Sequence, residues 1–419
     1  MESANRLIEY RCLNCGTGYP VDPFPYTCKD CGQNLDAIFD YSRIGSLWTK
    51  ADLAADPDRS IWRYLPLLPV QSPPEIRSIQ VGGTPLVEAP QLTGDYDIKR
   101  LFIKDDTRNP SGSLKDRASE VGLQHAAELG HDILVAASTG NAAASLAALA
   151  AFYGKQAIIL APASAPIAKL TQILQYGAIL CPVDGTYDDA FDLAGIVAEE
   201  YGWYSRSTGI NPVLTEGKKT VALEIAEQLN WVVPDKIFVP VGDGCIISGV
   251  YKGFYDLKEL GWIDRLPEII AVQASGSAAV VNVLAGGGNL ESVVADTVAD
   301  SIAVDFPRDG LKALRAVRNT GGFGIAVTDD EILWAQKELS EKSGIFAEPA
   351  AAAAVAGFVK ARHSNQVSDN DTVILLVTGS GLKDITAAQR MLAVPAAVKP
   401  EINAFRQFYS EIRKTGLGV

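Results

Sequence analysis

Short apolar runs alternate with longer amphipathic stretches along most of the chain after residue 80. The runs occupy residues 101–106, 133–138, 157–162, 178–183, 236–242, 268–274 and 372–379. Between them, apolar side chains recur with helical spacing, as in residues 114–130 and 187–202. Continuous apolar runs are typical of strands buried on both faces, and their alternation with helices predicts a mostly parallel sheet covered by helices. The pattern therefore predicts an α/β fold, and such folds bind ligands at the carboxyl ends of their strands.

The first 42 residues lack this alternation and contain four of the six cysteines. Cys12, Cys15, Cys28 and Cys31 form two CxxC pairs, a spacing typical of a tetrahedral zinc site with four thiolate ligands. Since the protein then fills every coordination position, we expect structural Zn²⁺; degenerate or redox-active cysteines are the alternative. We predict a zinc-ribbon-like segment over 1–42, a connector rich in Trp and Pro over 43–79, and the main body over 80–419.

Composition narrows the class of protein. A chain of 419 residues is too long for one small core, so two or more folding units are expected. It is 47% hydrophobic and 21% charged, as in a soluble globular protein, and its formal net charge of −13 argues against a nucleic-acid partner. No signal-peptide core is visible at the start, and the longest apolar stretches are shorter than the ~20 residues of a membrane helix. We therefore expect a cytoplasmic protein with no membrane partner.

Four polar turns each follow an apolar run and precede a helical stretch or the chain's last segment. NPSGSLKDR (109–117) carries a single lysine, Lys115, and STGNAAAS (138–145), VGDGCIISG (241–249) and TGSGLKD (378–384) are rich in Gly, Ser and Thr. Backbone N–H groups at strand-to-helix turns bind phosphate and carboxylate groups. Taken singly, the last three can also be explained as a helix cap or a glycine-rich turn.

Together and in this order, the turns resemble the motifs of pyridoxal-phosphate enzymes of fold type II, the tryptophan-synthase-beta-like group. GGTPLVEAP (82–90) looks like a strand of that group, and NPVLTEGKKTVALEI (211–225) and GIFAEPAAAAAVAG (344–357) look like threonine synthase and its near relatives. The resemblance covers residues 80 to about 395. It implies two subdomains with mostly parallel sheets covered by helices, the smaller one inserted at about residues 118–212, and a homodimer.

The resemblance also implies a role for each turn. Lys115 would form a Schiff base with the pyridoxal aldehyde and then move protons on the substrate. Asn141 would hydrogen-bond the ring oxygen of the cofactor, and Thr378 would meet its pyridine nitrogen. Ser138 and Thr139 would hold the substrate carboxylate. The expected phosphate loop comprises Gly242, Asp243, Gly244, Cys245 and Ile246.

Threonine synthase is the nearest resemblance, so the implied reaction converts O-phospho-L-homoserine and water into L-threonine and phosphate. Two alternatives stay open: a serine/threonine dehydratase or other lyase for β-elimination or β-replacement, and a catalytically retired interaction protein built around the ribbon. The sequence departs from the family pattern at Leu114, at Ala118 and in the phosphate loop, where Asp243 is unexpected beside an anion. Lys218 and Lys219 could neutralise a substrate phosphate, but a solvent-exposed helix start is the simpler expectation.

Overall fold

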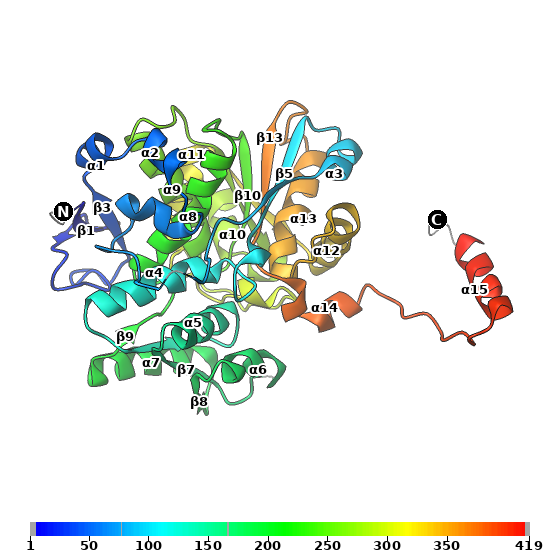
Figure 1. The fold of residues 1–419 in the computed structure, drawn as a ribbon, viewed down its shortest axis with the longest axis horizontal. Helices are drawn as coiled ribbons and strands as arrows, with labels where there is room; N and C mark the ends of the chain where they lie inside the picture. The colour runs from blue at the N-terminus through cyan, green and yellow to red at the C-terminus, as the bar shows by residue number, and fades with distance from the viewer. Residues whose placement is uncertain (1–5, 77, 166, 415–419) are drawn as a thin grey trace.

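The main body is built on two separate sheets, with a third, small sheet at the N-terminus (Figure 1). The computed structural model describes residues 6–76, 78–165 and 167–414. All seven apolar runs form strands, so the predicted α/β fold is confirmed. The sequence pattern missed the short strand β12 (Gly324–Val327), whose four residues begin with glycine.

The larger sheet has six strands in the order β12-β11-β10-β13-β5-β4, and every pair in it is parallel except β4–β5. The remaining strands are β4 (Leu86–Glu88), β5 (Arg100–Asp105), β10 (Lys236–Pro240), β11 (Glu268–Ala274) and β13 (Thr372–Val377). Alternate side chains enter different cores: Ile237 and Val239 belong to one hydrophobic cluster and Phe238 to another. Both faces of this sheet are therefore covered, which explains why its strands are apolar throughout.

The smaller sheet has four strands in the order β8-β7-β6-β9, all parallel. They are β6 (Ile133–Ala137), β7 (Gln156–Pro162), β8 (Ile179–Val183) and β9 (Tyr204–Ser205). Helices α5 (Asn141–Phe152), α6 (Ile167–Gln175) and α7 (Tyr187–Tyr201) pack around it (Figure 1). This sheet lies within the stretch predicted as the smaller subdomain, whose exact limits stay a prediction.

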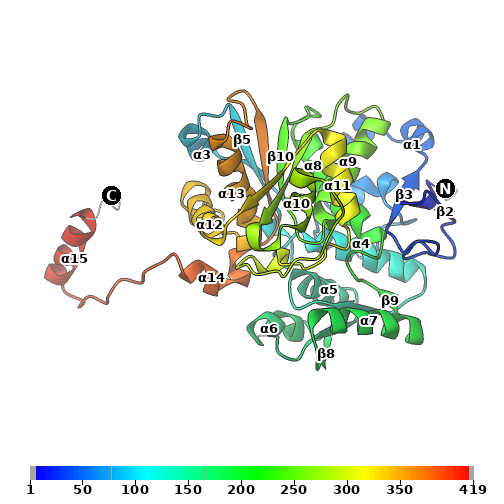
Figure 2. The ribbon, with the colours of Figure 1, turned by 180° about the vertical axis from the view of Figure 1, so that it is seen from behind.

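The helices of the larger sheet fall into two groups, one on each face (Figure 2). One group contains α8 (Val213–Gln228), α9 (Cys245–Glu259) and α11 (Gly310–Thr320); the other contains α3 (Pro90–Asp95), α12 (Asp329–Ser343) and α13 (Pro349–His363). The main body also contains helices α4 (Lys115–Glu128), α10 (Ala279–Gly286), α14 (Ile385–Gln389) and α15 (Ile402–Lys414), and α15 lies apart from the rest (Figure 1). Among the described helices, none combines the length and apolar character needed to cross a membrane.

The N-terminal sheet is antiparallel and consists of β1 (Leu7–Cys12), β2 (Gly18–Tyr19) and β3 (Leu35–Phe39). It packs on the main body. Lys312 Nζ donates to the carbonyl oxygen of Leu35 at 2.7 Å, and the Ser205 N–H donates to the Tyr26 hydroxyl at 3.0 Å. The connector forms α1 (Tyr41–Leu47), α2 (Lys50–Ala55) and the 3₁₀ helix η1 (Ile61–Leu67).

Candidate functional site

Lys115 is the first residue of helix α4, and the turn before it is held by the end of strand β13. The Leu114 N–H donates to the carbonyl oxygen of Thr378 at 2.9 Å, and the Ser380 N–H donates to that of Gly112 at 3.0 Å. Gly112 has φ +80°, a conformation that residues with a Cβ rarely adopt. The glycine in NPSGSLKDR is therefore needed for the path of the turn that presents Lys115.

The turn opens into a cavity of about 410 Å³, a size typical of small-molecule sites. The cavity lies where β6, β10 and β13 end, as expected for an α/β fold. All ten residues predicted to hold cofactor or substrate line it: Lys115, Ser138, Thr139, Asn141, Gly242, Asp243, Gly244, Cys245, Ile246 and Thr378. The fold thus brings together residues from four separate turns, and their individual roles stay predictions.

The loop Gly242–Ile246 has the shape of an anion cradle. Gly244 has φ +95°, and a Cβ there would lie 2.8 Å from the carbonyl oxygen of Asp309. A Cβ on Gly242 would lie 3.0 Å from the Cα of Ile302. Helix α9 begins at Cys245, so its unpaired N-terminal N–H groups and helix dipole favour an anion beside this loop. These features fit the phosphate group of pyridoxal phosphate.

Asp243, which was unexpected in a phosphate loop, has a structural task. Its carboxylate accepts a hydrogen bond from the Arg308 N–H at 3.3 Å, and its carbonyl oxygen accepts one from the Asp309 N–H at 2.9 Å. Burial raises the pKa of the Asp243 carboxyl, while the nearby positive charge of Arg308 lowers it. Asp243 therefore fastens the Gly242–Ile246 loop to the 308–309 segment.

Positive charge gathers around Lys115. Burial lowers the pKa of Lys115 to about 8, and the neighbouring positive charges of Lys218 and Arg206 act in the same direction. Arg206 lines the cavity. Its Nη1 donates to the Thr208 hydroxyl and its Nη2 to the Ser119 hydroxyl, both at 3.0 Å. A lowered pKa provides a neutral amine near pH 8, the form that attacks a carbonyl group.

The expectation that Lys218 and Lys219 form a solvent-exposed helix start is wrong. Both side chains are fully buried in α8, which packs against α4 and α9. Lys219 is ion-paired with Glu216, and with Asp256 at 2.6 Å, so it has no free charge for a ligand. No described residue hydrogen-bonds the Nζ of Lys218.

Glu348 is a cavity residue that the sequence did not single out, although it stands in the motif GIFAEPAAAAAVAG. It is buried just before α13, and its N–H donates to the carbonyl oxygen of Gly379 at 2.9 Å. Its carboxylate oxygens accept hydrogen bonds from Asn141 Nδ2 at 2.8 and 3.0 Å. Burial raises the pKa of Glu348. The pair joins the STGN turn to the α13 side of the cavity.

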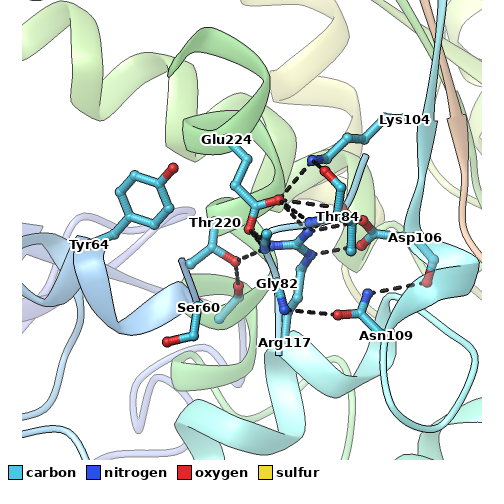
Figure 3. Close-up of polar contacts among 12 residues, drawn as sticks. Ser60, Tyr64, Gly82, Thr84, Lys104, Asp106, Asn109, Arg117, Thr220 and Glu224 are labelled. Carbon is cyan, nitrogen blue, oxygen red and sulfur yellow. Dashed lines mark hydrogen bonds and ion pairs between the residues drawn. The ribbon is translucent and has the colours of Figure 1, made fainter. Parts of the chain in front are cut away.

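Behind Lys115, four buried charged residues form a neutral network, which we call the paired cluster: Lys104, Asp106, Arg117 and Glu224 (Figure 3). Arg117 donates from Nε and Nη2 to both carboxylate oxygens of Asp106, at 2.7 and 2.9 Å. It also donates from Nη1 and Nη2 to Glu224, at 2.7 and 2.8 Å, and Lys104 Nζ donates to Glu224 at 2.7 Å. The positive charges of Arg117 and Lys104 hold the pKa of Glu224 well below its usual value despite its burial.

The four N-terminal cysteines lie together, as their spacing predicts. Their sulfur atoms all lie within 4.8 Å of one another, and two of the separations, Cys12–Cys31 and Cys15–Cys28, are 3.5 Å. Four sulfurs at about 2.3 Å from a central Zn²⁺ would be about 3.8 Å apart. All four cysteines are free of disulfides. The donor set and its spacing fit a tetrahedral zinc ion.

Comparison with known proteins agrees with this geometry. A family model described as pyridoxal-phosphate dependent enzyme matches residues 77–379. Threonine synthase of Methanocaldococcus jannaschii is 39% identical over 407 residues, covering 96% of this chain and 99% of that protein. Threonine synthase of Methanosarcina acetivorans is 39% identical over 404 residues, covering 96% and 98%. A solved fungal L-serine ammonia-lyase from Rhizomucor miehei superposes with TM-score 0.62 at 26% identity, covering 71% of this chain and 93% of that one.

Proposed function

The chain belongs to the family of pyridoxal-phosphate-dependent enzymes, and from that premise we propose that it is a threonine synthase, converting O-phospho-L-homoserine and water into L-threonine and phosphate. Relatives with that name match it at 39% identity over 96% of its length. The observation that carries the proposal is that Lys115 lines a cavity of suitable size together with the Gly242–Ile246 anion cradle and two further basic side chains, Arg206 and Arg308. This arrangement argues against the alternative of a catalytically inactive interaction protein.

The residues around the cavity fit the cofactor. The Gly242–Ile246 loop would hold its phosphate, Thr378 would face the pyridine nitrogen, and Lys115 would bind its aldehyde. When bound, pyridoxal phosphate supplies an electron sink that stabilises negative charge on the carbons of an attached amino acid. The hydroxyl of Thr378 is neutral, so it leaves the ring less electron-withdrawing than a carboxylate partner would.

Lys115 would carry the protons in this reaction. Because its pKa is lowered to about 8, the amine exchanges protons near neutral pH. With the aldehyde released, the freed amine would take protons from the substrate Cα and Cβ as phosphate leaves Cγ. It would return one proton to Cγ and one to Cα, while water supplies the hydroxyl group that adds at Cβ. The turn at Gly112, just before α4, fixes the backbone position from which the Lys115 side chain would reach the substrate carbons.

Two further groups would hold the ends of the substrate. Ser138 and Thr139 precede α5, whose N-terminus favours a carboxylate. Arg206 lines the open cavity, donates only to hydroxyls among its hydrogen-bond partners in the described chain, and so keeps its charge for the substrate phosphate. Glu348 would orient Asn141 toward the ring oxygen of the cofactor.

Product analysis tests the proposal. With O-phospho-L-homoserine, the purified holoenzyme should release phosphate and form threonine in equal amounts. With L-serine or L-threonine alone, it should release little keto acid. Keto acid as the main product without phosphate release from O-phosphohomoserine would instead establish a dehydratase. No turnover of any of the three amino acids would remove the proposal.

For the N-terminal segment we infer a structural Zn²⁺ bound by Cys12, Cys15, Cys28 and Cys31. Two tight turns support this: Gly16 and Gly32 have φ +79° and +70°, and their N–H groups donate back to the carbonyl oxygens of Cys12 and Cys28. The ribbon packs through Tyr26 onto Ser205, next to Arg206, so its order should influence the cavity wall. The homodimer and the cytoplasmic location expected from the sequence stay predictions.

A further inference from the structure

Lys218 combines complete burial with the lack of any partner. Its side chain has 0% exposure, and its Nζ makes no hydrogen bond within residues 6–76, 78–165 and 167–414. An isolated charge in the protein interior is strongly unfavourable unless something compensates it. Burial lowers the pKa of Lys218, as expected for an ammonium group without a counter-ion at hydrogen-bonding distance. An unpaired buried ammonium group of this kind points to a ligand that supplies the missing negative charge.

The neighbouring lysine shows that the chain is able to compensate a buried ammonium group. Lys219 follows Lys218 on α8 and is equally buried, yet it is paired with Glu216 and with Asp256, the latter at 2.6 Å. The two lysines point to different sides of the helix because successive residues are about 100° apart. Lys218 therefore lacks a partner because the described segments packed against its side of α8 supply no carboxylate within hydrogen-bonding distance.

That side faces the phosphate loop. Helices α8 and α9 pack so closely that a Cβ on Gly249 would lie 2.8 Å from the Cβ of Lys218. Gly249 is four residues after Cys245, about one turn from the N-terminus of α9. The charge of Lys218 interacts with Cys245, Asp243 and Asp309 around the loop, and among positive charges it has the largest effect on the pKa of Lys115.

The loop itself lacks the charge that a phosphate dianion requires. Residues 242–246 include no basic side chain, and Arg308 beside the loop is already ion-paired with Asp188 at 2.6 Å. The N-terminus of α9 supplies the equivalent of about half a positive charge. Two negative charges on a buried phosphate would thus remain largely unbalanced without another cation.

We propose that Lys218 supplies the positive charge that balances the 5′-phosphate of pyridoxal phosphate bound at the Gly242–Ile246 loop. The proposal rests on the cofactor assigned above and does not depend on the substrate. It makes Lys218 a cofactor-binding residue. Arg206 lines the open cavity and Lys218 does not. Arg206 would therefore bind a phosphate that enters with the substrate.

The test compares two forms of the cofactor on purified apoprotein. Pyridoxal phosphate and pyridoxal differ only in the phosphate, so the ratio of their dissociation constants isolates the phosphate contribution. In Lys218→Met we expect pyridoxal phosphate to bind at least about tenfold more weakly, while pyridoxal binds within about twofold of the original protein. Lys218→Arg should restore part of the ratio, and Lys258→Met, which removes an exposed charge on α9, should leave it unchanged.

Thermal unfolding of the apoprotein provides a second readout. Removing an uncompensated buried ammonium group should keep or raise the melting temperature of the apoprotein, whereas the rise caused by added pyridoxal phosphate should shrink. A lower melting temperature with an unchanged affinity ratio would show a structural lysine and overturn the proposal. An unchanged ratio with a raised KM for O-phosphohomoserine would place Lys218 at the substrate phosphate and also overturn it. Because both readouts precede turnover, they stand whichever substrate the enzyme uses.

Discussion

Helices α4 and α8 each contribute to two groups of charges in the protein interior or at the cavity, and the groups differ in one respect. The paired cluster, Lys104, Asp106, Arg117 and Glu224, contains two positive and two negative residues joined by hydrogen bonds (Figure 3). The second group, which we call the pocket cations, consists of Lys115, Arg206 and Lys218. No carboxylate hydrogen-bonds any of these three within the described chain. A buried group that is neutral by itself serves the fold, whereas one with excess charge is set for anionic ligands.

The two groups also depend on each other. Arg117 is two residues after Lys115 on α4, and Glu224 is six residues after Lys218 on α8, so the contacts between Arg117 and Glu224 join the two helices that carry pocket cations. The helices touch closely there: a Cβ on Gly217 would lie 2.3 Å from the carbonyl oxygen of Arg117. The paired cluster thus holds in place the two helices that carry the pocket cations Lys115 and Lys218.

The largest effect is expected from removing Lys115, the pocket cation that we propose carries out the chemistry. Lys115→Ala should lower the rate of phosphate release by at least ~10³-fold, since no other amine can replace it, and should abolish covalent cofactor binding. The melting temperature of the apoprotein should not fall, because the side chain has no hydrogen-bond partner to lose among the described residues. Substantial residual turnover in a preparation free of host enzyme would contradict the assignment.

Breaking the paired cluster should instead lower the stability of the apoprotein, which Lys115→Ala is expected to leave intact. Arg117→Met leaves two buried carboxylates, Asp106 and Glu224, without their main partner, so the free energy of unfolding should fall by about 3–5 kcal/mol. Urea denaturation of the apoprotein measures this. Lys337→Met, which removes an exposed pair with Glu341, is the control and should change little. Equal effects of the two variants would refute the distinction between buried and exposed pairs.

The zinc site provides a test at a distance from both groups. The double change Cys12→Ser with Cys28→Ser should release the metal and lower the melting temperature by several degrees, while the cofactor stays bound to Lys115. Metal analysis and the visible absorbance of the holoenzyme measure the two outcomes. Full metal content in this variant would show that the four cysteines do not form the site.

The smallest expected effect is a shift in pH dependence. With a pKa of about 8, Lys115 is mostly a protonated, non-nucleophilic ammonium group below that pH and a neutral amine above it. The rate at which the apoprotein captures pyridoxal should therefore rise with pH and level off above about 8. Lys218→Met removes a like charge, so the midpoint should move to higher pH; stopped-flow absorbance follows it. A midpoint that stays in place would show that the two lysines are not coupled.

Much of the fold could be predicted from local pattern. The seven apolar runs became strands because burial on both faces of a sheet leaves a continuous apolar stretch in the sequence. The turns around Lys115, Asn141 and Thr378 were visible because each follows such a strand. Strand β12 escaped because its four residues carry too little signal, and Glu348 escaped because its partner Asn141 lies 207 residues away.

The sequence alone determined the order of the motifs, the spacing of the cysteines and the identity of the amine in NPSGSLKDR, since each depends on residues close together in the chain. Only the tertiary structure decided what the adjacent residues Lys218 and Lys219 do. Two neighbours on a helix face different surroundings, and the partners of Lys219 include Asp256, which belongs to another helix. Whether a buried charge is neutralised by the protein or left for a ligand depends on which distant segments pack beside it, and a local pattern does not contain that information.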